Sequence, residues 1–159
     1  MNEIILYTDG SVNNQLKIGY GAYLIVREDD STIIDLKARV KVKCFENTSS
    51  TKLEIQTILW ALNELSPINQ KVILYTDSQN MIGLIARRAK LEKDNYSSKK
   101  NSLIKNHLEY KKFFKLTDRI DIEFIKIKGH QSAAQKSDVD KIFALVDKAS
   151  RLALRNHLK

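Results

Sequence analysis

Two short apolar runs that each end in Tyr-Thr-Asp constrain the fold of this chain more than any other feature. The first occupies residues 3–11 and carries Asp9, and the second occupies residues 71–78 and carries Asp77. Both have the length and side chains of buried strands, and the Asp with its following small residue marks where each strand ends. If the strands are parallel neighbours, the two carboxylates emerge at one edge of the sheet. Carboxylates that close repel each other unless a cation lies between them.

Either copy alone is ordinarily a turn or a helix cap, so the interpretation needs a further acid in the right place. Glu54 supplies one. Good N-cap residues at 47–50 precede apolar residues at helical spacing, and Pro67 ends the pattern. Glu54 is predicted in the first turn of this helix, where an acid ordinarily complements the helix dipole. In company with Asp9 and Asp77 it becomes a candidate ligand.

The remaining elements predict one α/β domain over residues 1–159. Residues 19–26 form a strand whose glycines allow close backbone approach, and residues 32–43 alternate well enough to be a third strand of an antiparallel meander. The other expected elements are a short helix at 78–86, a helix at about 101–116, a last strand at 121–128 and a closing helix that carries Val139, Phe143 and Val146. The stretch 90–100 is either an exposed loop or a helical extension. This order predicts one mixed sheet with helices on its faces.

Charge and composition point to a basic protein with a polyanionic partner. The formal net charge is +8, and residues 87–115 carry ten bases against three acids. Such a block favours nucleic acid, although a solvated lysine-rich helix surface explains it equally well. Cys44 is the only cysteine, which excludes an internal disulfide or a cysteine zinc cluster. With no signal-like N-terminus and no run of membrane-spanning length, we expect a cytoplasmic protein with no membrane partner.

The acids and the basic charge together indicate a chemistry. Asp9, Glu54 and Asp77 would come from two neighbouring strand ends and the helix between them, and an acid of the last helix could complete the cluster. Hard oxygen ligands without His or Cys favour Mg²⁺ or Mn²⁺ over zinc. Clustered acids on a basic protein suit phosphodiester hydrolysis.

These motifs resemble those of the type 1 ribonucleases H, the family that cuts the RNA strand of RNA/DNA hybrids. The resemblance runs from end to end and rests on five motifs in family order: Tyr7-Thr-Asp-Gly-Ser11, Thr51-Lys-Leu-Glu54, Tyr75-Thr-Asp-Ser-Gln79, Ile127-Lys-Gly-His130 and Asp147-Lys-Ala-Ser-Arg-Leu-Ala153. It implies a single ribonuclease H-like domain whose five-stranded mixed sheet has helices on both faces. It also implies an endoribonuclease that acts on hybrids.

The resemblance further implies the catalytic residues. Carried over by motif, they are Asp9, Glu54, Asp77 and Asp147 as ligands of two Mg²⁺ ions, with Mn²⁺ as the other option, and His130 as a helper in proton transfer or product release. Two-metal hydrolysis would leave 5′-phosphate and 3′-hydroxyl ends.

The fourth ligand has two competitors, Asp138 and Asp140, because the interval between His130 and Asp147 is longer than in compact bacterial enzymes. Asp147 is preferred because it alone precedes the Ala-x-Arg-x-Ala pattern and lies well inside the helix. Asp138 is expected to cap that helix.

The expected substrate contacts follow the same motifs. Gln79 matches a position that faces the substrate, and Ser50, Thr51 and Asn47 are expected at sugars or phosphates. Arg87, Arg88 and Lys90, from the basic block, would hold the other strand of the hybrid, although that block lacks the tryptophans usual in the family. We expect a monomer. The alternatives are a DNA nuclease or junction resolvase of the same superfamily and a nucleic-acid-binding module without catalysis.

Overall fold

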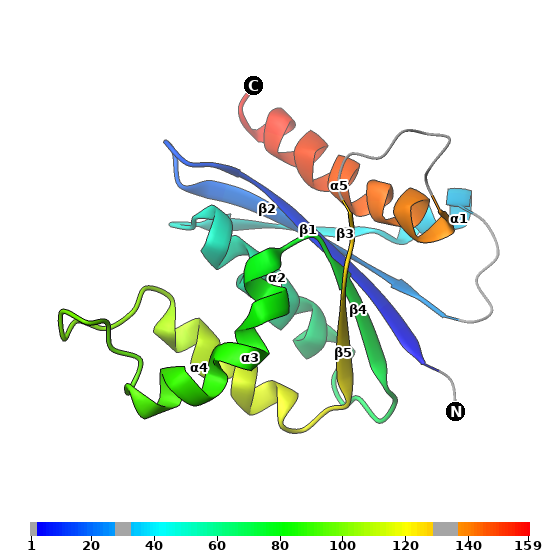
Figure 1. Cartoon of the computed structure of the whole chain (residues 1–159). Helices are drawn as coiled ribbons and strands as arrows, with labels where there is room; N and C mark the ends of the chain where they lie inside the picture. The colour runs from blue at the N-terminus through cyan, green and yellow to red at the C-terminus, as the bar shows by residue number, and fades with distance from the viewer. Residues whose placement is uncertain (1–2, 28–32, 129–136) are drawn as a thin grey trace.

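A computed structural model of the chain describes residues 3–27, 33–128 and 137–159, and it contains one five-stranded mixed sheet. The strand order is β3-β2-β1-β4-β5, with β1 antiparallel to β2, β2 antiparallel to β3, and β1, β4 and β5 mutually parallel (Figure 1). The elements are β1 (Ile4–Asn13), β2 (Ile18–Val26), α1 (Ile33–Arg39), β3 (Lys41–Glu46), α2 (Ser50–Leu65), β4 (Val72–Thr76), α3 (Gln79–Lys93), α4 (His107–Thr117), β5 (Ile122–Lys126) and α5 (Asp138–His157). The predicted mixed sheet with helices on both faces is confirmed.

Two hydrophobic cores, one on each face of the sheet, follow from the alternation of side chains along the strands. Leu6 and Leu74 belong to the core under α2, α3 and α4, whereas Tyr7 and Leu24 belong to the core under α1 and α5. Figure 1 shows the same division, with α1 and α5 on one side of the sheet and the other three helices on the opposite side. Of the helices within the described ranges, none is long and apolar enough to span a bilayer.

The predicted strand at 32–43 is wrong in its first part. Residues Ile33–Arg39 form the short helix α1, and the third strand of the meander is β3, which pairs with β2 in the register Ile18 to Glu46. Leu36 is buried in the core under α5, while Ile34 is 82% exposed, although strand alternation would place both on one face. A seven-residue helix anchored by one leucine is decided by its tertiary contacts, because so short a segment has no clear periodicity.

The boundaries of the helices on the other face also differ from the prediction. Helix α3 extends to Lys93 rather than ending at residue 86, and α4 begins at His107. The stretch 90–100 is therefore helical at its start and a loop afterwards. Backbone hydrogen bonds close that loop, Ser98 N–H donating to Ser102 O at 2.7 Å and Ile104 N–H donating to Tyr96 O at 2.8 Å. The ring of Tyr96 is buried beneath it.

Helix α2 approaches β1 and β2 closely because three strand residues are glycines, as the sequence predicted for Gly19 and Gly21; Gly10, predicted in the turn that ends the first strand, lies inside β1. A Cβ atom on Gly21 would lie 2.2 Å from Oγ1 of Thr57, and one on Gly10 or Gly19 would lie 2.8 Å from a methyl group of Leu53. Thr57 and Leu53 are both buried. The glycines therefore set the distance of α2 from the sheet, and with it the position of Glu54, the residue after Leu53.

We predict that Gly21→Ala lowers both stability and activity. The added methyl group meets the buried Thr57 side chain, and such overpacking costs roughly 1–3 kcal/mol. Moving α2 outward also displaces Glu54. Thermal unfolding and cleavage rates measure the two effects, with Gly83→Ala as the matched control, because a Cβ there meets only the end of Arg87 at 3.5 Å. Equal behaviour of the two variants would contradict the close-approach argument.

Candidate active site

The parallel pairing of β1 and β4 brings the two Tyr-Thr-Asp motifs together. Tyr7 lies opposite Tyr75 in the register, and their rings stack with centroids 5.0 Å apart. Asp9 and Asp77 each lie two residues further along the chain. The expectation that these strands are parallel neighbours is confirmed, and the two carboxylates are close enough for Asp77 to raise the pKa of Asp9. The predicted strand end at Asp9 is wrong: Asp77 follows the end of β4, but Asp9 lies inside β1, opposite Ala22, because β1 continues along β2 to Asn13.

Asp9 lies among other acids, and its pKa reflects this. Burial and the negative charge of Asp77 raise the pKa of Asp9 to about 8, against a smaller lowering by a hydrogen bond from the Gly10 N–H. A hydrogen bond between the carboxyl groups of Asp9 and Asp147, which requires a proton on one of them, raises it further. Asp9 therefore holds its proton near neutrality unless a cation replaces it.

Glu54 lies on α2, which covers one face of the sheet, whereas Asp147 lies on α5, which covers the other. Asp77 is the acid of the cluster that interacts with Glu54. Glu54 lies in the second turn of α2 rather than in the predicted first turn, because the helix begins at Ser50 with Ser49 as N-cap. Burial raises the pKa of Glu54, the charge of Asp77 adds to this effect, and a hydrogen bond with the Ser78 side chain opposes it. The helix dipole alone does not account for an acid in this position.

Asp147 is held beside Asp9 by a polar contact between α5 and β1. The fully buried Ser150 hydroxyl donates to the Asp147 carbonyl at 3.0 Å and lies 3.2 Å from the Ser11 hydroxyl, two residues beyond Asp9. Arg151 donates to a carboxylate oxygen of Asp147 at 2.5 Å. The backbone and the side chain of Asp147 are thus each held by one neighbour on its own helix.

Asp140 and Asp138 have other positions at the start of α5. The N-cap is Ser137, so the prediction that Asp138 caps the helix is wrong. The Asp140 side chain closes a capping box by accepting from the Ser137 N–H at 3.0 Å. Asp140 also precedes Asp147 by seven residues, about 10 Å along a helix axis. This geometry favours Asp147 as the fourth acid.

The acids interact in pairs: Asp9 with Asp77, Asp9 with Asp147, and Glu54 with Asp77. Within the described ranges, no three His, Cys, Asp or Glu side chains converge closely enough to hold one ion as they stand. Pairwise spacing is what mutual repulsion produces. The candidate ligands nevertheless all offer oxygen atoms, which suits a hard divalent cation. A bound cation would also offset the repulsion between the carboxylates that contributes to the raised pKa of Asp9.

Gln79 and His130 are the other two residues predicted to act beside the acids. Gln79 is the first residue of α3, two residues after Asp77, and its side-chain oxygen accepts from the Lys126 ammonium at 2.7 Å. This bond links α3 to β5. His130 lies outside the described residues, and its role stays a prediction.

The three predicted basic contacts have different surroundings. Arg88 pairs with Glu92 and, through both terminal nitrogens, with Asp118 at 2.6 and 2.9 Å, and its guanidinium lies over Phe114. Lys90 is 84% exposed on its side chain and lies 3.7 Å from Asp94. Arg87 donates to Asn80 at 2.7 Å. Arg88 thus joins α3 to the end of α4, which weakens the case for Arg88 as a substrate contact.

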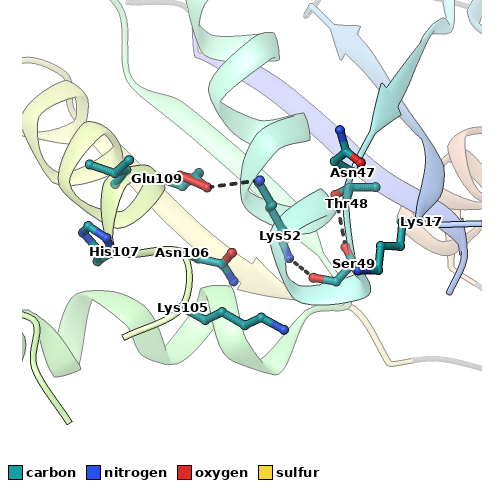
Figure 2. A pocket seen from close by; sticks show the side chains of 10 residues that line it. Lys17, Asn47, Thr48, Ser49, Lys52, Lys105, Asn106, His107 and Glu109 are labelled. Atoms are coloured by element: carbon teal, nitrogen blue, oxygen red, sulfur yellow. Dashed lines mark hydrogen bonds and ion pairs between the residues drawn. The ribbon is translucent and has the colours of Figure 1, made fainter. Parts of the chain in front are cut away.

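A basic hollow between α2 and α4 was not foreseen from the sequence. It encloses about 280 Å³, and the side chains of Lys17, Lys52 and Lys105 line it together with Asn47, Thr48, Ser49, Asn106, His107, Leu108 and Glu109 (Figure 2). The predicted contact Asn47 belongs to it, but Ser50 and Thr51 do not line it. Lys17, Asn47 and Asn106 share positive φ angles of 55°, 52° and 68°. The two asparagines were the one sequence signal for this hollow, because asparagine adopts positive φ angles more readily than most residues do.

Comparisons with known proteins agree with this architecture. The sequence model of the RNase H family matches residues 1–146, ending one residue before Asp147. A protein named Ribonuclease H from Clostridium botulinum is 29% identical over 146 residues, covering 89% of this chain and 93% of its own. One from Caldanaerobacter subterraneus is 26% identical, with coverage of 99% and 95%. The solution structure of the PFV RNase H domain has a TM-score of 0.69 at 21% identity, covering 95% of this chain and 93% of its own, which shows a shared fold.

Proposed function

The chain belongs to the RNase H family, and from this premise we propose that it cleaves the RNA strand of RNA/DNA hybrids by hydrolysis that depends on two divalent cations. The family acts on such hybrids and generally uses divalent metal ions. The observation that carries the proposal for this chain is the set of carboxylates around Asp9, whose pKa is raised to about 8 by burial, by the charge of Asp77 and by Asp147. Acids whose pKa values are raised by burial and by one another are concentrated at functional sites.

In this proposal Asp9, Glu54, Asp77 and Asp147 hold the cations. Asp9 is the shared ligand because it interacts with acids on both sides, and it must lose its proton when the ions bind. When bound, two Mg²⁺ ions, or Mn²⁺ ions in their place, supply an activated water and stabilise the charge on the leaving 3′ oxygen, so that the products carry 5′-phosphate and 3′-hydroxyl ends. Ser150 and Arg151 position Asp147.

The basic hollow is proposed as the binding site of a backbone phosphate of the hybrid. Two helix N-termini meet there, those of α2 at Ser49 and of α4 at Asn106, and helix N-termini attract anions. Asn106 makes no side-chain cap bond to α4, and Nδ1 of His107 is buried without a partner among the described residues. Ser49 precedes Glu54 by five residues, about 8 Å along the axis of α2. One nucleic acid strand can therefore extend from the hollow to the acids.

We predict that Lys17→Gln combined with Lys105→Gln weakens hybrid binding. Each lysine neutralises at most one phosphate, so the slope of log affinity against log salt should become shallower by roughly one to two. Titration of a labelled hybrid in EDTA, which prevents metal-dependent cleavage, measures both the affinity and its dependence on salt concentration. Lys141→Gln, an exposed lysine of α5 on the other side of the sheet, is the matched control. An unchanged slope in the double variant would remove the hollow from the binding surface.

The proposed function itself is tested with duplexes of one sequence in three forms: RNA/DNA, RNA/RNA and DNA/DNA. Each is incubated with the purified protein in Mg²⁺, in Mn²⁺ and in EDTA, and the ends of any products are mapped. Metal-dependent loss of the RNA strand from the hybrid alone, with 5′-phosphate ends, is the expected result. Preferential cutting of DNA would establish the DNA nuclease alternative. Hybrid binding without cleavage in either metal would establish a binding module.

A further inference from the structure

Residues of α1 and α5 line a groove that, among the described residues, shares only Arg151 with the surroundings of the acids. Figure 1 shows these two helices on the face of the sheet opposite α2 and α4. The volume of the groove is about 560 Å³, twice that of the basic hollow. Val40, Leu145 and Leu152 form an apolar floor. Leu152 is 53% exposed there, whereas Phe143 and Val146 of the same helix are buried in the core under α5.

The rim of this α1–α5 groove is basic. Lys37 lies on one side, from α1, and Lys148 and Arg155 lie on the other, from α5, and all three are exposed. None of the described residues that line the groove is acidic. Arg151 also reaches it, but Asp147 neutralises that charge. The groove therefore presents positive charge on both sides of an apolar strip.

We propose that the α1–α5 groove binds an extended acidic peptide segment of a partner protein, one that carries large apolar side chains between its carboxylates. The carboxylates of such a peptide would pair with Lys37, Lys148 and Arg155. Its apolar side chains would at the same time cover Leu145 and Leu152. The phosphates of a nucleic acid backbone would pair with the basic side chains of the rim. They would leave the apolar floor exposed to water, because phosphate groups have no apolar surface. The groove thus fits an amphipathic anion better than a duplex.

The test uses a fluorescein-labelled peptide of about twelve residues in which aspartate and glutamate alternate with leucine and phenylalanine, a length that spans a groove of this kind in extended form. Two companion peptides separate the contributions: one replaces the apolar residues by serine, and the other replaces the acids by asparagine and glutamine. Anisotropy with the full-length protein should detect the first peptide alone at micromolar concentration. Equal binding of the serine peptide would reduce the groove to a general polyanion surface and overturn the proposal.

Variants locate the binding. Lys148→Gln with Arg155→Gln removes rim charge, and Leu152→Ser removes part of the floor; each should weaken peptide binding on the order of tenfold. Lys141→Gln and Leu158→Ser are matched controls, since both residues are exposed near or on α5 but do not line the groove. Arg151 is left intact because it contacts Asp147. Circular dichroism and melting temperature verify that each variant is folded.

Hybrid affinity in EDTA, measured on the same proteins, distinguishes the peptide from nucleic acid. The groove variants should bind hybrid as the wild type does. If they lose hybrid affinity and peptide affinity to the same degree, or if the peptide binds the groove variants as tightly as the controls, the proposal is wrong. Absence of peptide binding at millimolar concentration would overturn it as well.

Discussion

Asp9→Asn is expected to abolish metal-dependent cleavage and, in the absence of metal, to make the folded protein more stable at neutral pH. The loss of activity follows from removing the carboxylate that interacts with both Asp77 and Asp147. The gain in stability follows from the raised pKa, because at neutral pH the carboxyl group is ionised in the unfolded chain and must take up a proton on folding, a cost that asparagine does not have. Loss of function with a more stable fold is the signature of a site built for a ligand.

The pH dependence of this effect has a definite sign. The pKa of Asp9 is raised from 3.8 to about 8 on folding, so the unfolded chain releases this proton more readily than the folded protein. Below about pH 4 the carboxyl group is protonated in both states, and its raised pKa does not change the free energy of unfolding. As pH rises from 4 toward 8, the raised pKa lowers the free energy of unfolding of the wild type increasingly. Each pKa unit corresponds to about 1.4 kcal/mol, and one to a few kcal/mol of difference at neutral pH is expected.

Thermal unfolding of wild type and Asp9→Asn in EDTA between pH 4 and pH 8 measures this difference. The two melting curves should converge at the acidic end and separate toward neutrality, with the variant higher. Added Mg²⁺ should stabilise the wild type and have little effect on the variant. Asp121→Asn, an exposed aspartate at the start of β5, is the control. Retained cleavage in Asp9→Asn, or a variant less stable than wild type at neutral pH, would contradict the assignment.

Asp147→Asn and Asp140→Asn are expected to have opposite effects, and this pair decides the fourth ligand. Asp147→Asn removes a carboxylate beside Asp9 and should lower kcat by at least about a hundredfold, as loss of a group that stabilises transition-state charge does. Its stability should change little, because the ion pair with Arg151 is half exposed. Asp140→Asn removes the negative charge from the first turn of α5 but keeps an oxygen that can accept from the Ser137 N–H, so it should cost no more than about 1 kcal/mol of stability, with kcat retained.

Single-turnover cleavage rates and chemical unfolding of both variants provide the two measurements. A third variant, Arg151→Gln, keeps the Asp147 carboxylate but frees it from its partner, and an intermediate loss of activity is expected if Arg151 only positions it. The reverse pattern, with Asp140→Asn inactive and Asp147→Asn active, would transfer the fourth ligand to the start of α5.

The part of the site that lies on the strands could be predicted from the sequence because strand patterns are local. Tyr7 and Tyr75 mark equivalent points of two apolar runs, and their pairing in the sheet brings Asp9 and Asp77, each two residues further on, close to each other. Glu54 was predictable for a similar reason, since a strong N-cap and regular apolar spacing define α2. The exact turn was not, because cap choice shifts a helix start by a few residues.

The parts that escaped prediction depend on residues far apart in the chain. The apolar alternation at 32–43 suits a strand, but Leu36 is buried by contact with the core under α5, which makes the segment a helix. Arg88 was expected at the substrate, yet its partner Asp118 lies 30 residues away. The hollow of Lys17, Lys52 and Lys105 likewise joins three separate segments.

The sequence by itself therefore determined the mixed sheet, the two strands whose Tyr-Thr-Asp motifs carry Asp9 and Asp77, and the helix that carries Glu54, because side-chain period and capping chemistry act over a few neighbouring residues. It placed the end of the first strand at Asp9, whereas β1 continues to Asn13 through its pairing with β2. Only the tertiary structure shows what holds the two candidates for the fourth ligand: α5 lies against β1 through the contact of Ser150 with Ser11, and Asp140 closes the capping box of that helix. It also formed the basic hollow and the α1–α5 groove, because a cavity exists only where elements distant in sequence pack side by side.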